Sequence, residues 1–230
     1  GIPVRWETRA EALEPGPSPA LRLHDGTRLE ARALLLASGA RRRRLEVPGE
    51  TTFDGHGLSY SATRDRAELA GRHVVVVGGG DAAYENALLL VAADCTVTLL
   101  VRGRTRARRE FRERVAAESR ITVHEGVAVR ALLGDEVLRA ARIEDATGVR
   151  ELACEGMVVK IGVIPNTEWC RAVVAHDADG WLQVDATQAT SVPDVWAAGD
   201  VVRPALPSIS VAAGQGALAI AAIRRALRGA

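Results

Sequence analysis

The most regular feature of the sequence is a short apolar run that ends in glycine. Residues 74–77 are four valines, three glycines follow them, and residues 81–93 carry a helix-like apolar pattern. Another apolar run covers residues 96–101. A continuous β-branched run is typical of a strand that is buried on both faces. The order strand, glycine turn, helix, strand therefore predicts a βαβ unit with a parallel sheet.

The pattern predicts further elements on both sides of this unit. Before it we expect an antiparallel, hairpin-like start with strands at 4–10, 21–24 and 27–31, a buried strand at 33–37, and a loop at 48–57. After it, the expected elements are a helix at 108–119, a strand at 121–124, an antiparallel meander at 127–154, a strand at 156–161, apolar segments at 181–184 and 195–198, and an Ala-rich helix at 208–227.

Composition places the chain among globular proteins. It has 230 residues, of which 47% are hydrophobic and 26% charged, values close to the average for a packed domain. The most apolar stretches are shorter than the roughly 20 residues of a membrane span or are broken by Gly and Gln, so we expect no membrane partner. The formal net charge is only +1, which argues against a nucleic-acid partner.

The cysteines and histidines show no ligand spacing. Cys95, Cys154 and Cys170 are an odd number without a C-x-x-C pair, which argues against a disulfide framework and a zinc site. The histidines are scattered, so we expect no bound metal. Free cysteines fit a reducing compartment, and no signal-peptide pattern opens the chain, so the expected location is cytoplasmic.

The glycine turn carries the clearest chemical signal. Gly78 to Ala83 fits the pattern G-x-G-x-x-A after a strand and before a helix, the context in which it indicates dinucleotide binding. Gly78 permits the turn, Gly80 lets a pyrophosphate approach the backbone, and Ala83 keeps the helix close to the sheet. Unpaired N–H groups and the dipole at the helix N-terminus attract the phosphates. A tight turn without a ligand is the alternative.

The end of the next strand indicates which nicotinamide cofactor is bound. NAD sites place an acid about 20 residues after the glycines, whereas NADP sites place arginine nearby. Residues 101–109 contain five arginines and no acid, and in the whole chain only Lys160 is lysine among 30 basic residues. This favours NADP, with Arg102 and Arg106 as ligands of its 2′-phosphate. A solvated arginine face is the alternative.

Several segments together resemble the low-molecular-weight thioredoxin reductases. Residues 78–87, with Glu85 among them, are similar to the NADPH-domain signature of that family. The other similar segments are residues 36–40 (its A-T-G-A segment), 47–49 (its crossing between domains), 161–167 (its return crossing), 197–201 (its second flavin motif) and 212–217 (the helix start beside the flavin ring). The resemblance covers essentially the whole chain in the right order.

The resemblance implies an α/β protein with two Rossmann-like nucleotide-binding domains and an antiparallel β-meander in each. Residues 1–47 and 163–230 would belong to an incomplete FAD domain, and residues 48–162 to an NADP domain inserted in it. FAD and NADP are the implied cofactors, and a homodimer is the implied assembly. The implied FAD-binding residues are Ser38, Gly39, Gly199, Asp200, Gly214, Gln215, Gly216 and Ala217. The implied NADP-binding residues are Gly78, Gly79, Gly80, Asp81, Ala82, Ala83, Glu85, Arg102, Arg106, Ile161 and Gly162.

The chain departs from the family in two places. The family opens with a strand and a G-x-G-x-x-G that holds the ADP half of FAD, and nothing similar precedes residue 1. On the ordinary size of such a half, we expect that roughly 80 residues are absent. Where the family has C-A-T-C-D, residues 61–65 read S-A-T-R-D. Thiol–disulfide exchange needs a thiolate and a resolving thiol, so we expect no dithiol chemistry.

Three polar features each have two interpretations. Asp65 matches the family acid that helps protonate the dithiol, or is a plain loop carboxylate. Ser61 and Arg64 stand at the positions of the lost cysteines, and Arg64 either faces the flavin or an anionic acceptor, or is surface charge. The run Arg41-Arg42-Arg43-Arg44 is either a docking patch for an acidic redox protein such as ferredoxin or a solvated turn.

We therefore expect an NADPH-dependent flavoprotein oxidoreductase of the thioredoxin-reductase-like type. It would pass hydride from NADPH to FAD and electrons on to a small molecule or a redox protein other than thioredoxin. A ferredoxin–NADP reductase of the thioredoxin-reductase-like type is one alternative. A non-catalytic NADP- or FAD-binding sensor or partner module is the other.

Overall fold

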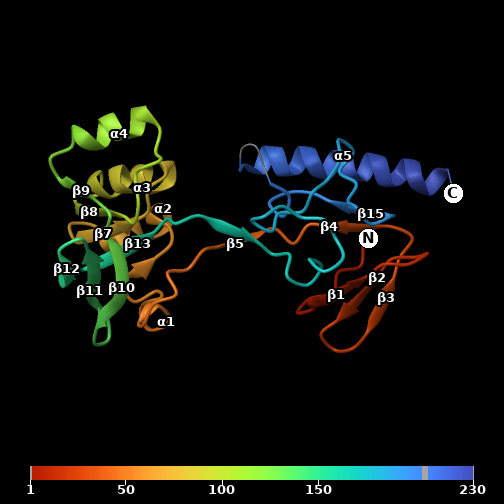
Figure 1. The fold of residues 1–230 in the computed structure, drawn as a ribbon, viewed down its shortest axis with the longest axis horizontal. Helices are drawn as coiled ribbons and strands as arrows, with labels where there is room; N and C mark the ends of the chain where they lie inside the picture. The colour runs from red at the N-terminus through yellow and green to blue at the C-terminus, as the bar shows by residue number, and fades with distance from the viewer. Residues whose placement is uncertain (1, 204–206, 230) are drawn as a thin grey trace. The chain divides into compact units, whose positions relative to one another are not determined.

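The chain divides into two units. The computed structural model describes residues 2–203 and 207–229 (Figure 1). Unit 1 combines residues 1–41 with residues 163–230, and unit 2 is formed by residues 42–162. Unit 2 is therefore inserted in unit 1. Two short strands that lie at the crossings, β5 (Ala40–Arg42) and β14 (Val163–Pro165), pair with each other.

A five-stranded parallel sheet forms the centre of unit 2. Its order is β6-β13-β7-β8-β9, and all neighbouring strands are parallel. The strands are β6 (Leu58–Ser59), β7 (His73–Val77), β8 (Thr96–Val101), β9 (Ile121–Glu125) and β13 (Gly156–Val159). The helices are α1 (Glu50–Phe53), α2 (Ala62–Leu69), α3 (Asp81–Val91) and α4 (Arg109–Ala116). The meander consists of β10 (Ala128–Gly134), β11 (Leu138–Asp145) and β12 (Gly148–Ala153).

Both faces of this sheet are covered, which explains the run of four valines. Successive side chains of a strand point to opposite faces. Val74 and Val76 pack in one core with residues of α3 and α4, whereas Val75 and Val77 pack in another with residues of the meander. Each valine is at most 6% exposed, and burying one such side chain stabilises the fold by about 1.5 kcal/mol or more.

Unit 1 contains a second meander, a parallel strand pair and a long helix. The meander consists of β1 (Ala10–Glu14), β2 (Ala20–Leu23) and β3 (Arg28–Glu30), and the parallel pair of β4 (Leu34–Leu36) and β15 (Val195–Ala197). Helix α5 (Ile209–Arg228) buries Ala219 in one cluster with Trp196 and Ala198. The predicted α/β fold, with parallel strands and one antiparallel meander in each unit, is confirmed.

Two local predictions are wrong. The first strand covers Ala10–Glu14 rather than residues 4–10, because Leu13 enters the core while Val4 and Trp6 are 60% and 83% exposed. The predicted loop at 48–57 is interrupted by α1, and Asp65, which could have been a plain loop carboxylate, lies with Arg64 in the helix α2. The signal for α2 was its N-cap, since Ser61 accepts a hydrogen bond from the Arg64 amide.

The contacts of the chain place the start of unit 2 at Arg42 rather than at Pro48. Leu45 and Val47 pack against the core that the sheet forms with the meander. The segment between the two positions therefore belongs with unit 2.

A buried carboxylate holds this segment in place. Glu50 is 4% exposed and accepts hydrogen bonds from the amides of Leu45 and Glu46, both at 2.8 Å, and from the Tyr60 hydroxyl at 2.7 Å. Arg44 lies 3.7 Å from the same carboxylate. Burial, and next the bond to Glu50, raise the pKa of Tyr60 above its ordinary value.

We predict that Glu50→Ala lowers the free energy of unfolding of unit 2 by about 3 kcal/mol, because it leaves buried donors without an acceptor. The matched control is Glu151→Ala, which removes an exposed carboxylate that pairs with Arg142 on the meander and should cost less than about 1 kcal/mol. The measurement is urea unfolding followed by circular dichroism. All four tryptophans lie in unit 1, so their fluorescence identifies the unit that unfolds. Equal losses for the two variants would contradict the assignment.

Candidate nucleotide-binding site

The glycine turn joins two strands and a helix at very short range. Gly78 has a φ of +147°, and a Cβ built on it would lie 2.2 Å from the carbonyl oxygen of Lys160 and 3.0 Å from the Cβ of Ala83. A Cβ on Gly79 would lie 2.7 Å from a methyl group of Val101. Only glycine fits these two positions without a shift of its neighbours. The turn therefore packs β7 directly against β13, β8 and the first turn of α3.

The third glycine leaves open space at the start of α3. Gly80, the N-cap of α3, has no protein atom within 4 Å of its missing side chain, and no side chain caps the helix. The described residues provide no acceptor for the amides of Asp81 and Ala82. A helix N-terminus with free amides and no side chain above it fits a phosphate group. The geometry thus meets the requirement for a bound pyrophosphate.

The loop after β8 is tied to the glycine turn at three points. The Arg106 amide donates to the carbonyl oxygen of Gly79 at 2.6 Å. The Thr105 hydroxyl lies 2.7 Å from the hydroxyl of Tyr84 on α3. The carboxylate of Asp81 accepts from Arg108 at 2.6 Å, and the backbone and side-chain bonds from that residue lower the pKa of Asp81. The loop therefore has a fixed position beside the N-terminus of α3.

The arginines of this loop fall into two groups. Arg108 and Arg109 form ion pairs with Asp81 and Glu113. The other three are exposed and have no carboxylate within 4.0 Å in residues 2–203 and 207–229; they are Arg102, Arg104 and Arg106. Unpaired guanidinium groups beside a dinucleotide turn match the donor set for a 2′-phosphate.

Other predicted NADP residues lie at the carboxyl edge of the sheet. Gly162 has a φ of +98° and open space at its Cβ position. Ile161 packs against the core that includes the meander, and Glu85 is exposed on α3. Lys160, which immediately follows β13, is half-buried next to the glycine turn. The predicted NADP residues therefore lie within one unit.

The segment at the lost cysteine positions forms a compact ion pair. Arg64 donates to both oxygens of Asp65, at 2.6 and 2.8 Å, and the Ser59 hydroxyl donates to the same carboxylate. The bond from Arg64, and less strongly that from Ser59, holds the pKa of Asp65 below its ordinary value. Ser61 begins α2 as its N-cap. Asp65 is consequently an ionised carboxylate that already accepts three hydrogen bonds.

Each of the three cysteines is buried separately from the other two. Cys95, Cys154 and Cys170 are free and at most 2% exposed. Burial raises the pKa of Cys154 and of Cys170 to about 11, and raises that of Cys95 as well. At neutral pH such thiols carry almost no thiolate, the reactive form.

In unit 1, two predicted FAD residues are joined to the returning chain. The Ser38 hydroxyl donates to the carbonyl oxygen of Asn166 at 2.8 Å, and the Asn166 side chain donates to the Ser38 carbonyl oxygen. The Asn166 amide donates to the carbonyl oxygen of Gly39. Gly39 has a φ of +66° and open space at its Cβ position. Asn166 therefore fixes the turn that follows β4.

The remaining predicted FAD residues gather where β15 ends and α5 begins. The Gly199 amide donates to the side-chain oxygen of Gln215 at 2.9 Å, and Asp200 is exposed. Gly214 and Gly216 have no neighbouring atom within 4 Å of a Cβ position. Together with Ala217, they give the first half of α5 a surface of small residues. Backbone groups and the exposed carboxylate of Asp200 near these small residues fit part of a flavin nucleotide.

The run of four arginines is not a uniform patch. Arg41 is bound to Asn166 and Glu168, and Arg44 pairs with Asp54 and lies over the Tyr60 ring. Within the described part of the chain, Arg42 and Arg43 have no ion pair. The four side chains therefore do not form one uniform cationic surface, because two of them are already paired with carboxylates.

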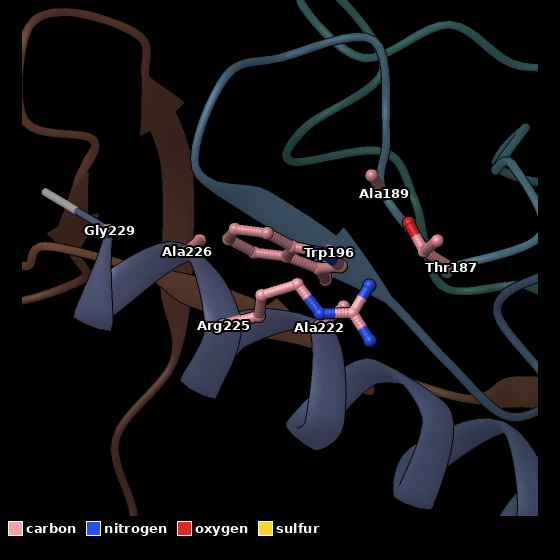
Figure 2. Close-up of a pocket in the computed structure, with 7 residues that line it drawn as sticks. All are labelled: Thr187, Ala189, Trp196, Ala222, Arg225, Ala226 and Gly229. Atoms are coloured by element: carbon pink, nitrogen blue, oxygen red, sulfur yellow. The ribbon is translucent and has the colours of Figure 1, made fainter.

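A hollow in unit 1 lies apart from these residues. It has a volume of about 410 Å³ between the second half of α5 and the segment before β15, and Arg225 reaches across Trp196 there (Figure 2). The lining residues are Thr187, Ala189, Trp196, Ala222, Arg225, Ala226 and Gly229. None of them belongs to a predicted cofactor site. The Trp196 Nε1 finds no hydrogen-bond partner among residues 2–203 and 207–229, but it has no exposed surface and so offers nothing to a ligand.

The described ranges hold neither a metal cluster nor a membrane-spanning helix. No three His, Cys, Asp or Glu side chains between residues 2 and 203 or 207 and 229 converge as metal ligands would. No described helix combines the length and the apolar character of a membrane span.

Sequence reasoning missed the contacts that hold the site together. Thr105, Tyr84 and Ser59 carry no motif, and their roles depend on neighbours distant in sequence. Lys160 stands out in the sequence as the only lysine, but the sequence assigns it no role.

Comparison with known proteins assigns the chain to a family. A component of the alkyl hydroperoxide reductase of Pseudomonas putida is 35% identical over 218 residues, 92% of this chain and 42% of that protein. Thioredoxin reductase of Treponema pallidum is 36% identical over 192 residues, 82% of this chain and 62% of that protein. The chain spans less than two thirds of the length of these relatives.

The crystal structure of Lactococcus lactis thioredoxin reductase matches with a TM-score of 0.82 at 27% identity, covering 96% of this chain and 75% of that one. Residues 5–216 match the family described as pyridine nucleotide-disulphide oxidoreductase, and the chain belongs to this family.

Proposed function

We propose that the chain forms the NADPH site and part of the FAD site of a flavoprotein oxidoreductase. The single observation that carries this proposal is the open glycine turn with unpaired arginines fixed beside it. The free amides of α3 fit a pyrophosphate, and Arg102, with Arg106 beside it, fits a 2′-phosphate. Family membership supports the redox chemistry.

The residues of the chain would bind and orient both cofactors. When bound, NADPH supplies a hydride and FAD accepts it. In unit 2, Gly80 gives the pyrophosphate access to the backbone, and Arg102 selects the phosphorylated ribose. In unit 1, Gly39 and Asp200 would hold the flavin nucleotide, and the N-terminal half of α5 would direct its positive dipole at the flavin ring and stabilise developing negative charge there.

The electron acceptor in this proposal is a small molecule or a redox protein other than thioredoxin. This proposal follows from the lack of a dithiol. The three cysteines are buried and have no C-x-x-C spacing, and their raised pKa values keep them in the thiol form at neutral pH. Asp65, paired with Arg64, has no thiol to protonate and serves to anchor the start of α2. A homodimer in the cytoplasm remains the expected form of the protein.

Two alternatives are separated by direct measurement. A thioredoxin-reductase-like ferredoxin–NADP reductase shares the absence of a dithiol, and would be identified by reduction of ferredoxin. A non-catalytic sensor would bind NADPH without passing electrons.

We predict that NADPH bleaches the visible absorbance of FAD in the flavoprotein to which this chain contributes, under anaerobic conditions, and that ferricyanide restores it. Gly80→Val is the matched control. A Cβ at Gly80 meets no protein atom within 4 Å and the backbone there is extended, so the fold should persist while the pyrophosphate position is filled. Binding of NADPH without any bleaching would contradict the catalytic proposal and favour the sensor.

We predict that Arg102→Ala raises the Kd for NADPH by about tenfold or more and that for NADH by less than about twofold, because only NADPH carries the 2′-phosphate. The readout is fluorescence of the bound dinucleotide. Arg139→Ala, which removes an exposed cation from the meander strand β11, should change neither Kd. Equal weakening of both dinucleotides by Arg102→Ala would contradict the assignment of a 2′-phosphate site.

A further inference from the structure

The only lysine of the chain lies at the point where the sheet changes direction. From β7 the chain moves to β8 and β9 on one side, whereas β13 lies on the other side of β7. In open α/β sheets, ligands bind outside the carboxyl ends of the strands at such a switch point. Lys160 follows β13 there: its amide donates to the Val77 carbonyl oxygen at 2.7 Å, and its own carbonyl oxygen faces Gly78.

The ammonium group of Lys160 is half-buried without a direct partner. In residues 2–203 and 207–229 it has no carboxylate within 4.0 Å and no hydrogen-bond acceptor. Its charged neighbours are Glu85 on α3, which attracts it, and Arg42, which repels it. Burial, and next Arg42, lower the pKa of Lys160. A half-buried cation with no carboxylate in direct contact is costly unless a ligand supplies a counter-charge.

The neighbours of Lys160 also show which part of a dinucleotide it would meet. Lys160 follows β13, which pairs with β7 up to Val77, so it lies beside the glycine turn on the side away from β8. The arginine loop follows β8, on the other side of the glycine turn. A dinucleotide whose 2′-phosphate lies at that loop and whose pyrophosphate lies at Gly80 extends its nicotinamide half toward β13.

We propose that Lys160 binds the phosphate of the nicotinamide mononucleotide half of NADPH. This inference rests on the proposed function of the glycine turn. Lysine binds phosphate as a point charge. The two cationic sites then have separate tasks: Arg102 selects the adenosine end, and Lys160 holds the other end and so positions the nicotinamide.

The test compares two probes by isothermal titration calorimetry with the 230-residue chain. NADP⁺ contains both ends, whereas adenosine 2′,5′-bisphosphate lacks the nicotinamide half. We expect Lys160→Met to weaken NADP⁺ binding about tenfold or more and to leave binding of the bisphosphate within about twofold. Lys160→Arg, which keeps the charge, should restore most of the NADP⁺ affinity. Arg102→Ala should weaken both probes.

Three results would overturn the inference, and they are distinguishable. Unchanged NADP⁺ affinity in Lys160→Met would show that the ammonium group does not contact the cofactor. Equal weakening of both probes would show that Lys160 supports only the shape of the turn. A wild-type chain that binds neither probe would refute the proposed function itself. Thermal unfolding followed by circular dichroism checks that each variant is folded.

Discussion

The close approach of Gly78 to the neighbouring strand is the constraint on which unit 2 depends. With 2.2 Å between the Lys160 carbonyl oxygen and the position of a Cβ, no side chain fits. This contact lets β7 pair with β13 up to its last residue and turn directly into α3. The start of α3, its free amides and Lys160 therefore come together at one edge of the sheet. A change at Gly78 would separate all of them at once.

The second constraint is the arrangement of charge around that turn. Asp81 and Arg108 neutralise each other and fix the loop after β8, so that Arg102 is left unpaired beside it. Arg64 and Asp65 neutralise each other at the start of α2. Among the described residues around the turn, Arg102 and Lys160 are thus left without a carboxylate partner where a phosphorylated dinucleotide would lie. Other arginines, such as Arg28 and Arg130, pair with carboxylates on the surface, where an ion pair contributes at most about 1 kcal/mol.

Much of unit 2 could be predicted because its signals are local. Four valines can only be buried on both faces, and the glycines that follow require a turn, so the strand, the turn and α3 are found at nearly the predicted residues. The start of β1 and the helix α2 could not be found this way, because they depend on which apolar residues reach the core and on one N-cap bond. The separate roles of the residues in the run 41–44 also depend on partners distant in sequence, such as Glu168.

The central claim is that the chain presents a site built for a phosphorylated dinucleotide, and calorimetric titration of the wild-type chain with NADP⁺ and with NAD⁺ tests it most directly. The account predicts saturable binding of NADP⁺ with one site per chain. It also predicts an affinity for NAD⁺ that is lower by about tenfold or more, a difference that decreases as salt is added. Equal affinities for the two dinucleotides, or no binding of NADP⁺, would contradict it.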